Sequence, residues 1–138
     1  MDTTITKTKL VTMAEYLECS INDLDWHDWG SQTEILLGHK GYIVLTDDEA
    51  DQAVEDYIKE SIWAFRPSFL KDYCDLSQEV LEHLQDKCES VNDLILSHIN
   101  NMDELIEEAI SLDGRGHFLA SYDGHENEHN DYFIYRTN

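Results

Sequence analysis

Residues 46–65 decide the fold class, and they read TDDEADQAVEDYIKESIWAF. Apolar side chains recur here every three or four residues, which is the spacing of one face of an α-helix. Thr46, with Glu49 three residues later, forms the capping-box pattern that begins a helix. Pro67 disfavours helical backbone just before it, so we predict that this helix ends near Phe65. The residues predicted to face inward are Ala50, Val54, Tyr57, Ile58, Ile62 and Phe65.

Three more helices are predicted on the C-terminal side of this one. They cover about 77–88, a segment capped by Ser90, and a segment that begins at Asn100 or Asn101 and stops at Asp113-Gly114. Their predicted inward residues are Val80, Leu81, Leu84, Cys88, Val91, Leu94, Ile95, His98, Ile99, Met102, Leu105, Ile106, Ala109 and Ile110.

Strands are predicted on either side of the helices. The short apolar runs 34–37 and 42–45 indicate a β-hairpin with a four-residue loop, and 132–135 indicates a third strand. Residues 1–11 are predicted to be frayed or an edge segment, Thr12 to cap a short helix that ends at Glu18, and 114–124 to be rich in turns. The sequence therefore predicts a helix-rich α+β single domain, residues 1–138, with a two- or three-stranded antiparallel sheet.

Charge narrows the classes of partner. Thirty Asp and Glu face nine Lys and Arg, which gives a formal net charge of −21. Such a chain repels nucleic acid and anionic membranes, and it attracts basic proteins or metal ions. A solubility adaptation, such as to a salt-rich habitat, is the alternative interpretation.

Cysteine usage and the N-terminus bear on location. Cys19, Cys74 and Cys88 are widely spaced without a CxxC pair, no segment resembles a signal peptide, and no apolar run approaches the ~20 residues of a membrane span. We expect a reduced, cytoplasmic setting with the cysteines buried as small apolar side chains.

Residues 125–129 read HENEH and match the zinc-protease motif HExxH. That motif needs an amphipathic helix and a third ligand, whereas this segment lacks apolar residues and has little chain after it. We therefore predict a solvated acidic loop and no cofactor, with His125 and His129 as the candidate metal ligands. A looser cation site could draw on His117, Asp123, His125, Glu126, Glu128 and His129, although the EF-hand spacing is absent.

Two further features have both a structural and a functional interpretation. Arg115, one of three arginines, is predicted to pair with Asp113 or Asp123 or to cap the preceding helix. Trp26 and Trp29, which are interleaved with aspartates, are either partner-binding anchors or partly core.

Acidic helix faces carry the main functional hypothesis. Carboxylates four residues apart on a helix lie about 6 Å apart, a spacing comparable to that of phosphates along a DNA strand. A rigid domain with such faces would imitate duplex charge and dock into the basic groove of a DNA-binding protein. An ordinary solvated acidic face is the alternative. The residues of the predicted binding surface are Asp47, Asp48, Asp51, Glu55, Asp56, Glu60, Asp103, Glu104, Glu107 and Glu108.

Two stretches resemble a family of small acidic proteins encoded in bacteriophage genomes. They are 42–51, YIVLTDDEAD, which runs on to IWAF at 62–65, and 113–124, DGRGHFLASYDG, with the closing YFIYRTN at 132–138. Relatives tend to have Glu where this chain has His125, which weighs against the zinc interpretation. The resemblance implies a phage setting and assigns no catalytic or binding residue. By analogy, it favours action on host nucleic-acid machinery.

The sequence thus predicts a non-enzymatic phage protein in the host cytoplasm. It is expected to inhibit a host nucleic-acid-binding enzyme, of the restriction or CRISPR type, by DNA mimicry. The expected partner is a basic host protein, with no direct contact to nucleic acid or membrane. The alternatives are a metal-dependent hydrolase that uses the His/Asp/Glu-rich C-terminal segment, and a virion or scaffold component that is acidic for solubility only.

Overall fold

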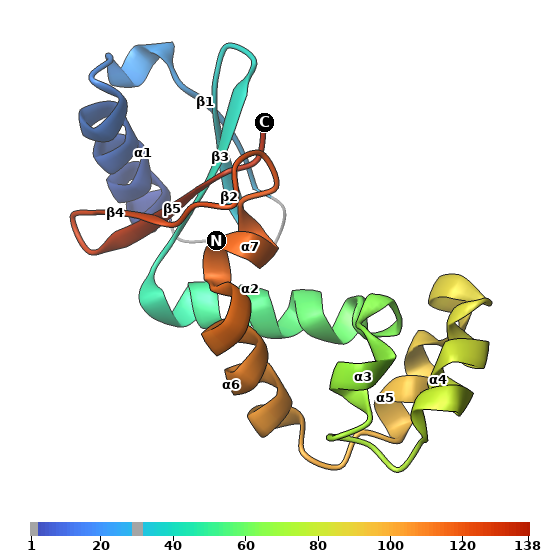
Figure 1. The fold of residues 1–138 in the computed structure, drawn as a ribbon. Helices are drawn as coiled ribbons and strands as arrows, with labels where there is room; N and C mark the ends of the chain where they lie inside the picture. Colours follow the sequence, from blue (N-terminus) through green and yellow to red (C-terminus); the bar gives the residue numbers. More distant parts are fainter. Residues whose placement is uncertain (1–2, 29–31) are drawn as a thin grey trace. The chain divides into compact units, whose positions relative to one another are not determined.

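The computed structural model describes residues 3–28 and 32–138. The chain divides into two compact units (Figure 1). Met1–Val54 and Arg115–Asn138 form the first, here called the sheet unit, and Glu55–Gly114 forms the second, the helical unit. The predicted α+β class is confirmed. The single-domain organisation stays a prediction.

The sheet unit contains one antiparallel sheet with the strand order β1-β2-β3-β5-β4. Five strands replace the two or three that the sequence predicts. The predicted hairpin and the predicted C-terminal strand lie side by side as β2, β3 and β5, and the polar strands β1 and β4 lie outside them. The strands are β1 (Asp25–Asp28), β2 (Thr33–Leu37), β3 (Lys40–Leu45), β4 (Asn127–His129) and β5 (Tyr132–Arg136).

Two tight turns set the register of the sheet. The loop between β2 and β3 is Gly38-His39 rather than four residues, because Leu37 pairs with Lys40 and Gly38 takes φ +62°. The loop between β4 and β5 is Asn130-Asp131, with φ values of 52° and 66°. Positive φ at both central positions is the type I′ geometry that matches strand twist, and Asn and Asp tolerate it. Residues 127–131, predicted as a loop, are therefore half of a hairpin.

Helix α1 (Thr3–Leu17) covers one face of the sheet (Figure 1). Met13 packs in a buried cluster with Ile35 of β2, Val44 of β3 and Ile134 of β5. Two predictions were wrong here: residues 3–11 are helical, and Thr12 is a buried residue within the helix instead of its cap. The stretch has no Gly or Pro to interrupt the helix, and burial of apolar residues against the sheet stabilises it beyond its local propensity.

Helix α7 (Arg115–Leu119) contacts β5 in the sheet unit. It replaces part of the turn-rich segment predicted for 114–124. Gly116 is buried, and a Cβ there would lie 2.6 Å from the backbone oxygen of Gly124. Only glycine therefore lets the 123–126 loop pack against this helix.

Helix α2 (Asp47–Glu60) begins in the sheet unit and ends in the helical unit. It stops before Phe65 because Asn92 takes the place of the next turn: its side chain accepts from the Trp63 NH at 3.1 Å and donates to the Lys59 oxygen at 2.7 Å. A 3₁₀ turn, Ile62–Ala64, follows. The remaining helices of this unit are α3 (Pro67–Leu70), α4 (Gln78–Gln85), the 3₁₀ turn Cys88–Val91, α5 (Asn92–Ser97) and α6 (Met102–Asp113).

Of the eighteen predicted inward positions of the helical unit, eight are buried, among them Ile58, Ile62, Leu81, Ile95 and Leu105, and six are half-buried. Tyr57, Val80, Leu94 and Cys88 are exposed, contrary to the prediction. For Val80 and Leu94 the reason is the shortness of α4 and α5: a helix of six to eight residues has a narrow buried stripe, which is taken by the neighbouring Leu81 and Ile95. Ser90 lies within a 3₁₀ turn and does not cap α5, whereas Asn101 caps α6 and Gly114 ends it.

Candidate functional site

The capping box at the start of α2 has the predicted geometry. The Thr46 hydroxyl accepts from the Glu49 NH at 3.2 Å, and Glu49 Oε1 accepts from the Thr46 NH at 2.9 Å. These two bonds satisfy backbone donors that the first turn of a helix leaves open. They fix the position from which Asp47, Asp48 and Asp51 project.

A buried lysine from α1 completes this site, and no local sequence pattern indicated its role. Lys9 Nζ lies 2.9 Å from Glu49 Oε1, and its side chain is only 2% exposed. Burial opposes the ionisation of Glu49, but hydrogen bonds from the Thr46 backbone and from Lys9 outweigh burial and hold the pKa of Glu49 below its usual range. Glu49 therefore links α1 to α2.

Arg115 forms ion pairs with three carboxylates in the sheet unit. Its Nη1 lies 2.9 Å from Asp47 Oδ1 and 2.9 Å from Asp51 Oδ1, and its Nη2 lies 2.6 Å from Glu126 Oε1. Nη1 also donates to the Asp47 backbone oxygen at 3.2 Å. The prediction that Arg115 pairs with Asp113 or Asp123 was wrong, because its partners Asp47 and Asp51 are remote in sequence and only the fold brings them together.

The Arg115 side chain is largely buried, with 11% of it exposed. The Phe133 ring lies beneath it at 4.6 Å from the centroid. Burial opposes the charge of Arg115, but hydrogen bonds to Asp47 and Glu126 outweigh it and raise its pKa. Burial, together with the hydrogen bond of 2.6 Å to Glu126, also raises the pKa of Tyr135, so its hydroxyl stays protonated and donates.

The predicted acidic surface is thus divided between two environments. On α2, Asp47 and Asp51 pair with Arg115, and Glu55 lies 3.2 Å from Lys59 Nζ. These pairs offset part of the negative charge of that face. Asp48, Asp56 and Glu60 are exposed on the same helix.

The acidic face of helix α6 is neutralised by basic side chains to a smaller extent than that of α2. Asp103, Glu104, Glu107 and Glu108 are all exposed, while Leu105, Ile106 and Ala109 are buried on the other side. Glu104 takes part in the Asn101 cap, and within the described part of the chain none of these four carboxylates forms an ion pair. The sequence has no Lys or Arg between Lys87 and Arg115. Rigid anchoring through the buried face holds these four charges at helical spacing.

The HExxH segment does not form a zinc-protease site in this structure. His125 and Glu126 lie in a loop, and His129 lies in strand β4, so the two histidines are not one helical turn apart. Glu126 is engaged by Arg115 and Tyr135. His129 Nε2 is 3.4 Å from Glu15 Oε2, and its ring lies edge-on to Tyr16.

The looser cation site, which the sequence analysis considered as an alternative to a solvated loop in the C-terminal segment, is not assembled in the structure either. Over the described residues, the ligand atoms that come together are those of Asp47, Asp48 and Asp51, within 4.8 Å of one another. The Arg115 guanidinium contacts two of these three carboxylates, so a protein cation already lies against the cluster.

The structure describes one of the two tryptophans that the sequence analysis singled out. Trp26 lies in β1 and is 43% exposed, which removes it from the core. Trp29 and Gly30 fall outside the described residues.

Among the described residues, no helix has both the length and the apolarity needed to cross a lipid bilayer. Comparison of the chain with protein-family models, with curated proteins and with solved structures finds no match.

Proposed function

We propose that the protein acts by binding, with the outer face of α6 as a charge mimic of nucleic acid. The proposed partner is a basic host enzyme of the restriction or CRISPR type, which the protein would inhibit in a phage-infected cell. The observation that carries the proposal is the exposed, unpaired set Asp103, Glu104, Glu107 and Glu108 on a helix with no basic residue.

Geometry supports this assignment of the contact face. Asp103 and Glu107 are one helical turn apart, as are Glu104 and Glu108, so the face carries two short rows with a spacing of about 6 Å. Each strand of DNA advances about 3.4 Å per nucleotide along the axis, with further separation from the rotation. A groove that binds phosphates through Lys and Arg would meet carboxylates at a comparable spacing.

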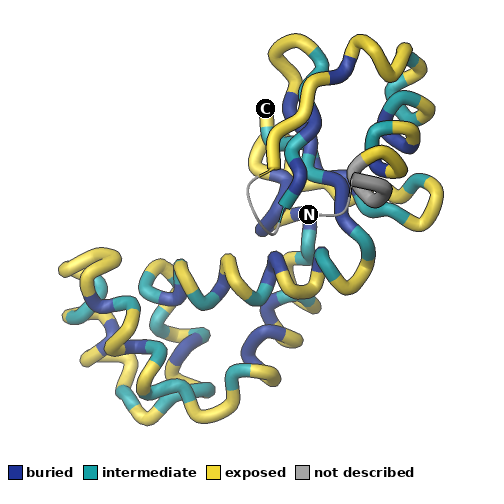
Figure 2. Tube along the Cα trace, turned by 180° about the vertical axis from the view of Figure 1, so that it is seen from behind, coloured by how far each residue is buried: buried dark blue, intermediate teal, exposed yellow. Residues whose placement is uncertain are grey.

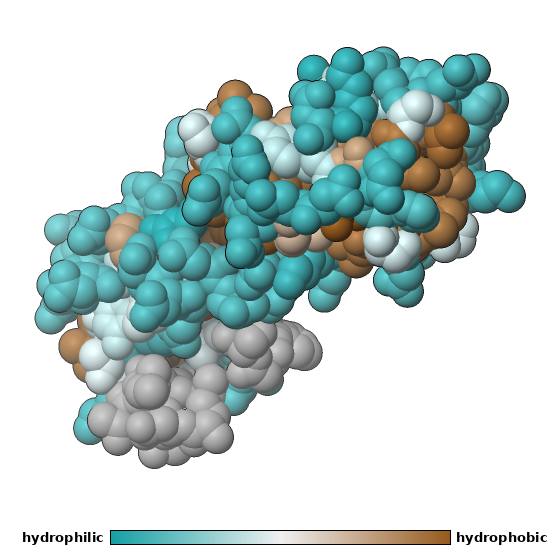
Figure 3. All heavy atoms as spheres, turned by 90° about the horizontal axis from the view of Figure 1, so that it is seen from below, coloured by the Kyte–Doolittle hydropathy of each residue, from teal (hydrophilic) through white to brown (hydrophobic). Residues whose placement is uncertain are grey.

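Rigidity supports it as well. The buried residues Leu105, Ile106 and Ala109 fix the helix against its unit, and Asn101 fixes its first turn. Charges that are already in place lose little conformational entropy on binding. Figure 3 shows that hydrophilic side chains cover most of the described surface in view, with apolar side chains in one larger area and in smaller patches elsewhere.

The test is competition with duplex DNA on purified restriction and CRISPR nucleases. The test variant carries Asp103→Asn, Glu104→Gln, Glu107→Gln and Glu108→Gln. The matched control carries Glu79→Gln, Glu82→Gln, Asp86→Asn and Glu89→Gln, which removes the same charge from exposed positions on and after α4. We expect the wild type and the control to displace the duplex, and the α6 variant to do so at least about tenfold less well and with a weaker salt dependence.

Two outcomes would contradict the proposal. Equal loss in both variants would show that net charge, rather than the α6 face, governs binding. Failure of the wild-type protein to displace the duplex from any nuclease at low salt would remove the proposed function altogether. Circular dichroism of both variants would verify that each is folded.

A further inference from the structure

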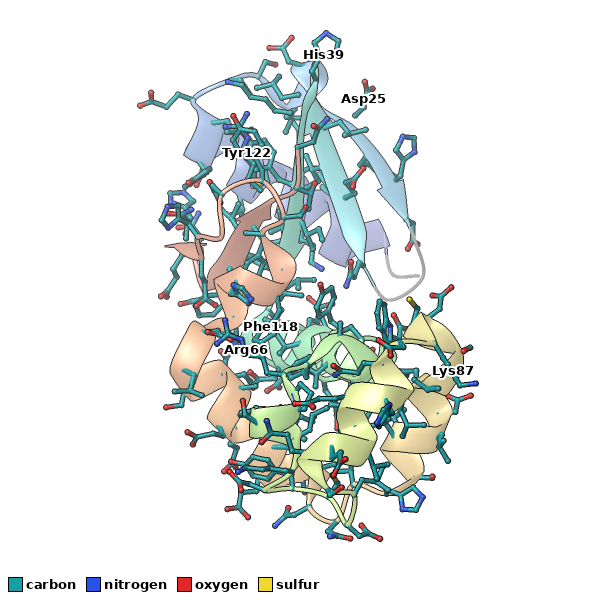
Figure 4. All side chains as sticks on the ribbon, turned by 45° about the vertical axis from the view of Figure 1, so that its right-hand side comes forward. Asp25, His39, Arg66, Lys87, Phe118 and Tyr122 are labelled. Atoms are coloured by element: carbon teal, nitrogen blue, oxygen red, sulfur yellow. The ribbon has the colours of Figure 1, made fainter. Side chains whose placement is uncertain are left out.

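Strand β1 forms one edge of the sheet and is exposed along its whole length. Its neighbour on one side is β2, and no described strand lies on the other side. All four residues of β1 are exposed, whereas Leu24 just before it is buried. Figure 2 colours the chain trace by burial, and Figure 4 labels Asp25 at the start of β1. This edge belongs to the sheet unit, whereas the α6 face considered above belongs to the helical unit.

The backbone of an edge strand is a template for another strand. In an antiparallel sheet, alternate residues direct both their NH and their carbonyl group toward the same side. The outward-facing groups of β1 can therefore accept an extended segment by strand addition. Proteins commonly block such edges with charged side chains, and Asp25 and Asp28 fit that device. The exposed Trp26 between them does not, because a blocking edge has no need of a large apolar ring.

Register gives the position of that ring. Trp26 pairs with Ile35, and side chains of paired residues lie on the same face of a sheet. Ile35 is fully buried in the cluster beneath α1, so Trp26 extends the same apolar face to the edge of the sheet. A residue of an added strand opposite Trp26 would continue that face outward.

The negative charge of β1 and its surroundings favours a basic segment as the added strand. Between Lys9 and Lys40 the sequence has no Lys or Arg and has six acidic residues, among them Asp25 and Asp28. A second copy of this chain is disfavoured, because the antiparallel register that pairs all four residues sets Asp25 of each copy opposite Asp28 of the other. Like charges directly opposite each other destabilise a strand pair, whereas Lys or Arg opposite aspartate stabilises it.

We propose that β1 binds an extended, Lys- or Arg-rich segment of another protein as an additional antiparallel strand. Basic side chains of that segment pair with Asp25 and Asp28, and an apolar side chain packs on Trp26. This site does not depend on the proposed role of α6, and it recognises a peptide backbone rather than a phosphate-binding groove.

The test uses a short synthetic peptide that contains Lys-Thr-Val-Lys, with both ends blocked, so that in the antiparallel register the two Lys lie opposite Asp28 and Asp25 and Val lies opposite Trp26. Amide hydrogen exchange is measured by NMR on the full-length protein with and without the peptide. We expect new protection in 25–28 and none in β4, the opposite edge of the sheet. A peptide with Glu in place of Lys, and one N-methylated at every residue, should give no protection.

Variants make the assignment specific. Asp25→Asn with Asp28→Asn should weaken peptide binding about threefold to thirtyfold, and Trp26→Ala should weaken it by itself. Glu18→Gln with Asp23→Asn, which removes equal charge from nearby exposed positions, should leave binding close to wild type. The α6 variant should also bind the peptide normally, which separates this proposal from the proposed function.

Three results would overturn the assignment. The first is binding of the N-methylated peptide as tightly as the parent, since strand addition needs the amide donors. The second is equal weakening in the Glu18/Asp23 control, which would indicate nonspecific charge attraction. The third is a dimer of the free protein that Trp26→Ala abolishes, which would make a second copy the occupant.

Discussion

Arg115 shows how much of the sheet unit depends on one side chain. Its guanidinium joins the first turn of α2 to Glu126, in the loop before β4, and it lies over Phe133 of β5. Scarcity of cations drew attention to this residue in the sequence. Its actual partners could not be read there, because Asp47 and Asp51 lie 68 and 64 residues away along the chain.

Replacement of Arg115 by lysine tests this role. Lysine keeps the charge but not the planar fork that contacts three carboxylates, so we expect the free energy of unfolding to fall by about 1–3 kcal/mol. Arg136→Lys is the matched control, since Arg136 stacks on the exposed Tyr122 ring at 3.8 Å and should cost less. Urea denaturation followed by circular dichroism measures both, and equal costs would contradict the role of the carboxylate contacts.

A second residue-scale prediction concerns Gly116. Alanine there places its Cβ 2.6 Å from the Gly124 backbone oxygen and 2.9 Å from the Glu126 nitrogen. Because backbone cannot rotate away as a side chain can, we expect a loss of about 1–3 kcal/mol. Gly41→Ala serves as the comparison. Its closest neighbour is the Thr137 side chain, at 2.9 Å, which can change rotamer. Thermal unfolding should rank Gly116→Ala as the less stable variant.

At the scale of elements, the buried Lys9 ammonium links α1 to α2, and its carboxylate partner among the described residues is Glu49. Glu49→Ala removes that partner and the capping bond at once, and it should cost about 3 kcal/mol because the Lys9 ammonium stays buried. Lys9→Met keeps the volume, and it should cost less than about 1 kcal/mol. Urea denaturation of both variants checks the order. A larger cost for Lys9→Met would mean that the ion pair itself contributes most of the stability.

The same pair predicts a pH dependence. The folded-state pKa of Glu49 is depressed, so its contribution is present above the unfolded value of about 4.3 and is lost as pH falls through the folded value. Glu49→Gln keeps the cap but cannot ionise. As pH is lowered from about 5 to about 3, a range that spans the unfolded pKa of Glu, we therefore expect the free energy of unfolding to fall less steeply in this variant than in the wild type. Parallel curves would refute the contribution.

At the scale of the whole molecule, repulsion among acidic residues competes with the local ion pairs. The net charge is −21, and the acidic residues are shared equally between the two units, fifteen in each. Salt screens both repulsion and attraction, but the thirty acidic residues far outnumber the nine Lys and Arg that could pair with them. Screening should therefore stabilise the folded state.

A salt titration shows whether repulsion among the acidic residues or attraction within the ion pairs has the larger effect on stability. The Debye length shrinks from about 30 Å at 0.01 M to about 3 Å at 1 M, and we expect Tm to rise over this range. NaCl and KCl should act alike, because the effect is general screening. A fall in Tm would mean that the Arg115 and Lys9 contacts outweigh the repulsion. A rise with traces of Mg²⁺ alone would instead indicate a specific cation site.

Local signals in the sequence determined the elements that depend on neighbouring residues. Thr46 with Glu49, Asn101 and Gly114 set helix ends through bonds within one turn, so their positions could be predicted. The strands β2, β3 and β5 contain apolar runs, which also signal locally. The acidic α6 face was predicted for the same reason, since periodicity places its charges outside and its leucine and isoleucine inside.

The features that join distant segments of the chain depend on its three-dimensional arrangement. Strand β4 and the edge strand β1 are polar, and they are strands because β5 and β2 supply their hydrogen-bond partners. Residues 3–11 are helical because α1 is stabilised on a sheet built from both ends of the chain. Lys9 pairs with Glu49, 40 residues away along the chain, and Arg115 pairs with Asp47 and Asp51, 68 and 64 residues away. The physical reason is the same in each case: burial and pairing energies depend on neighbours in space, which the order of residues does not specify.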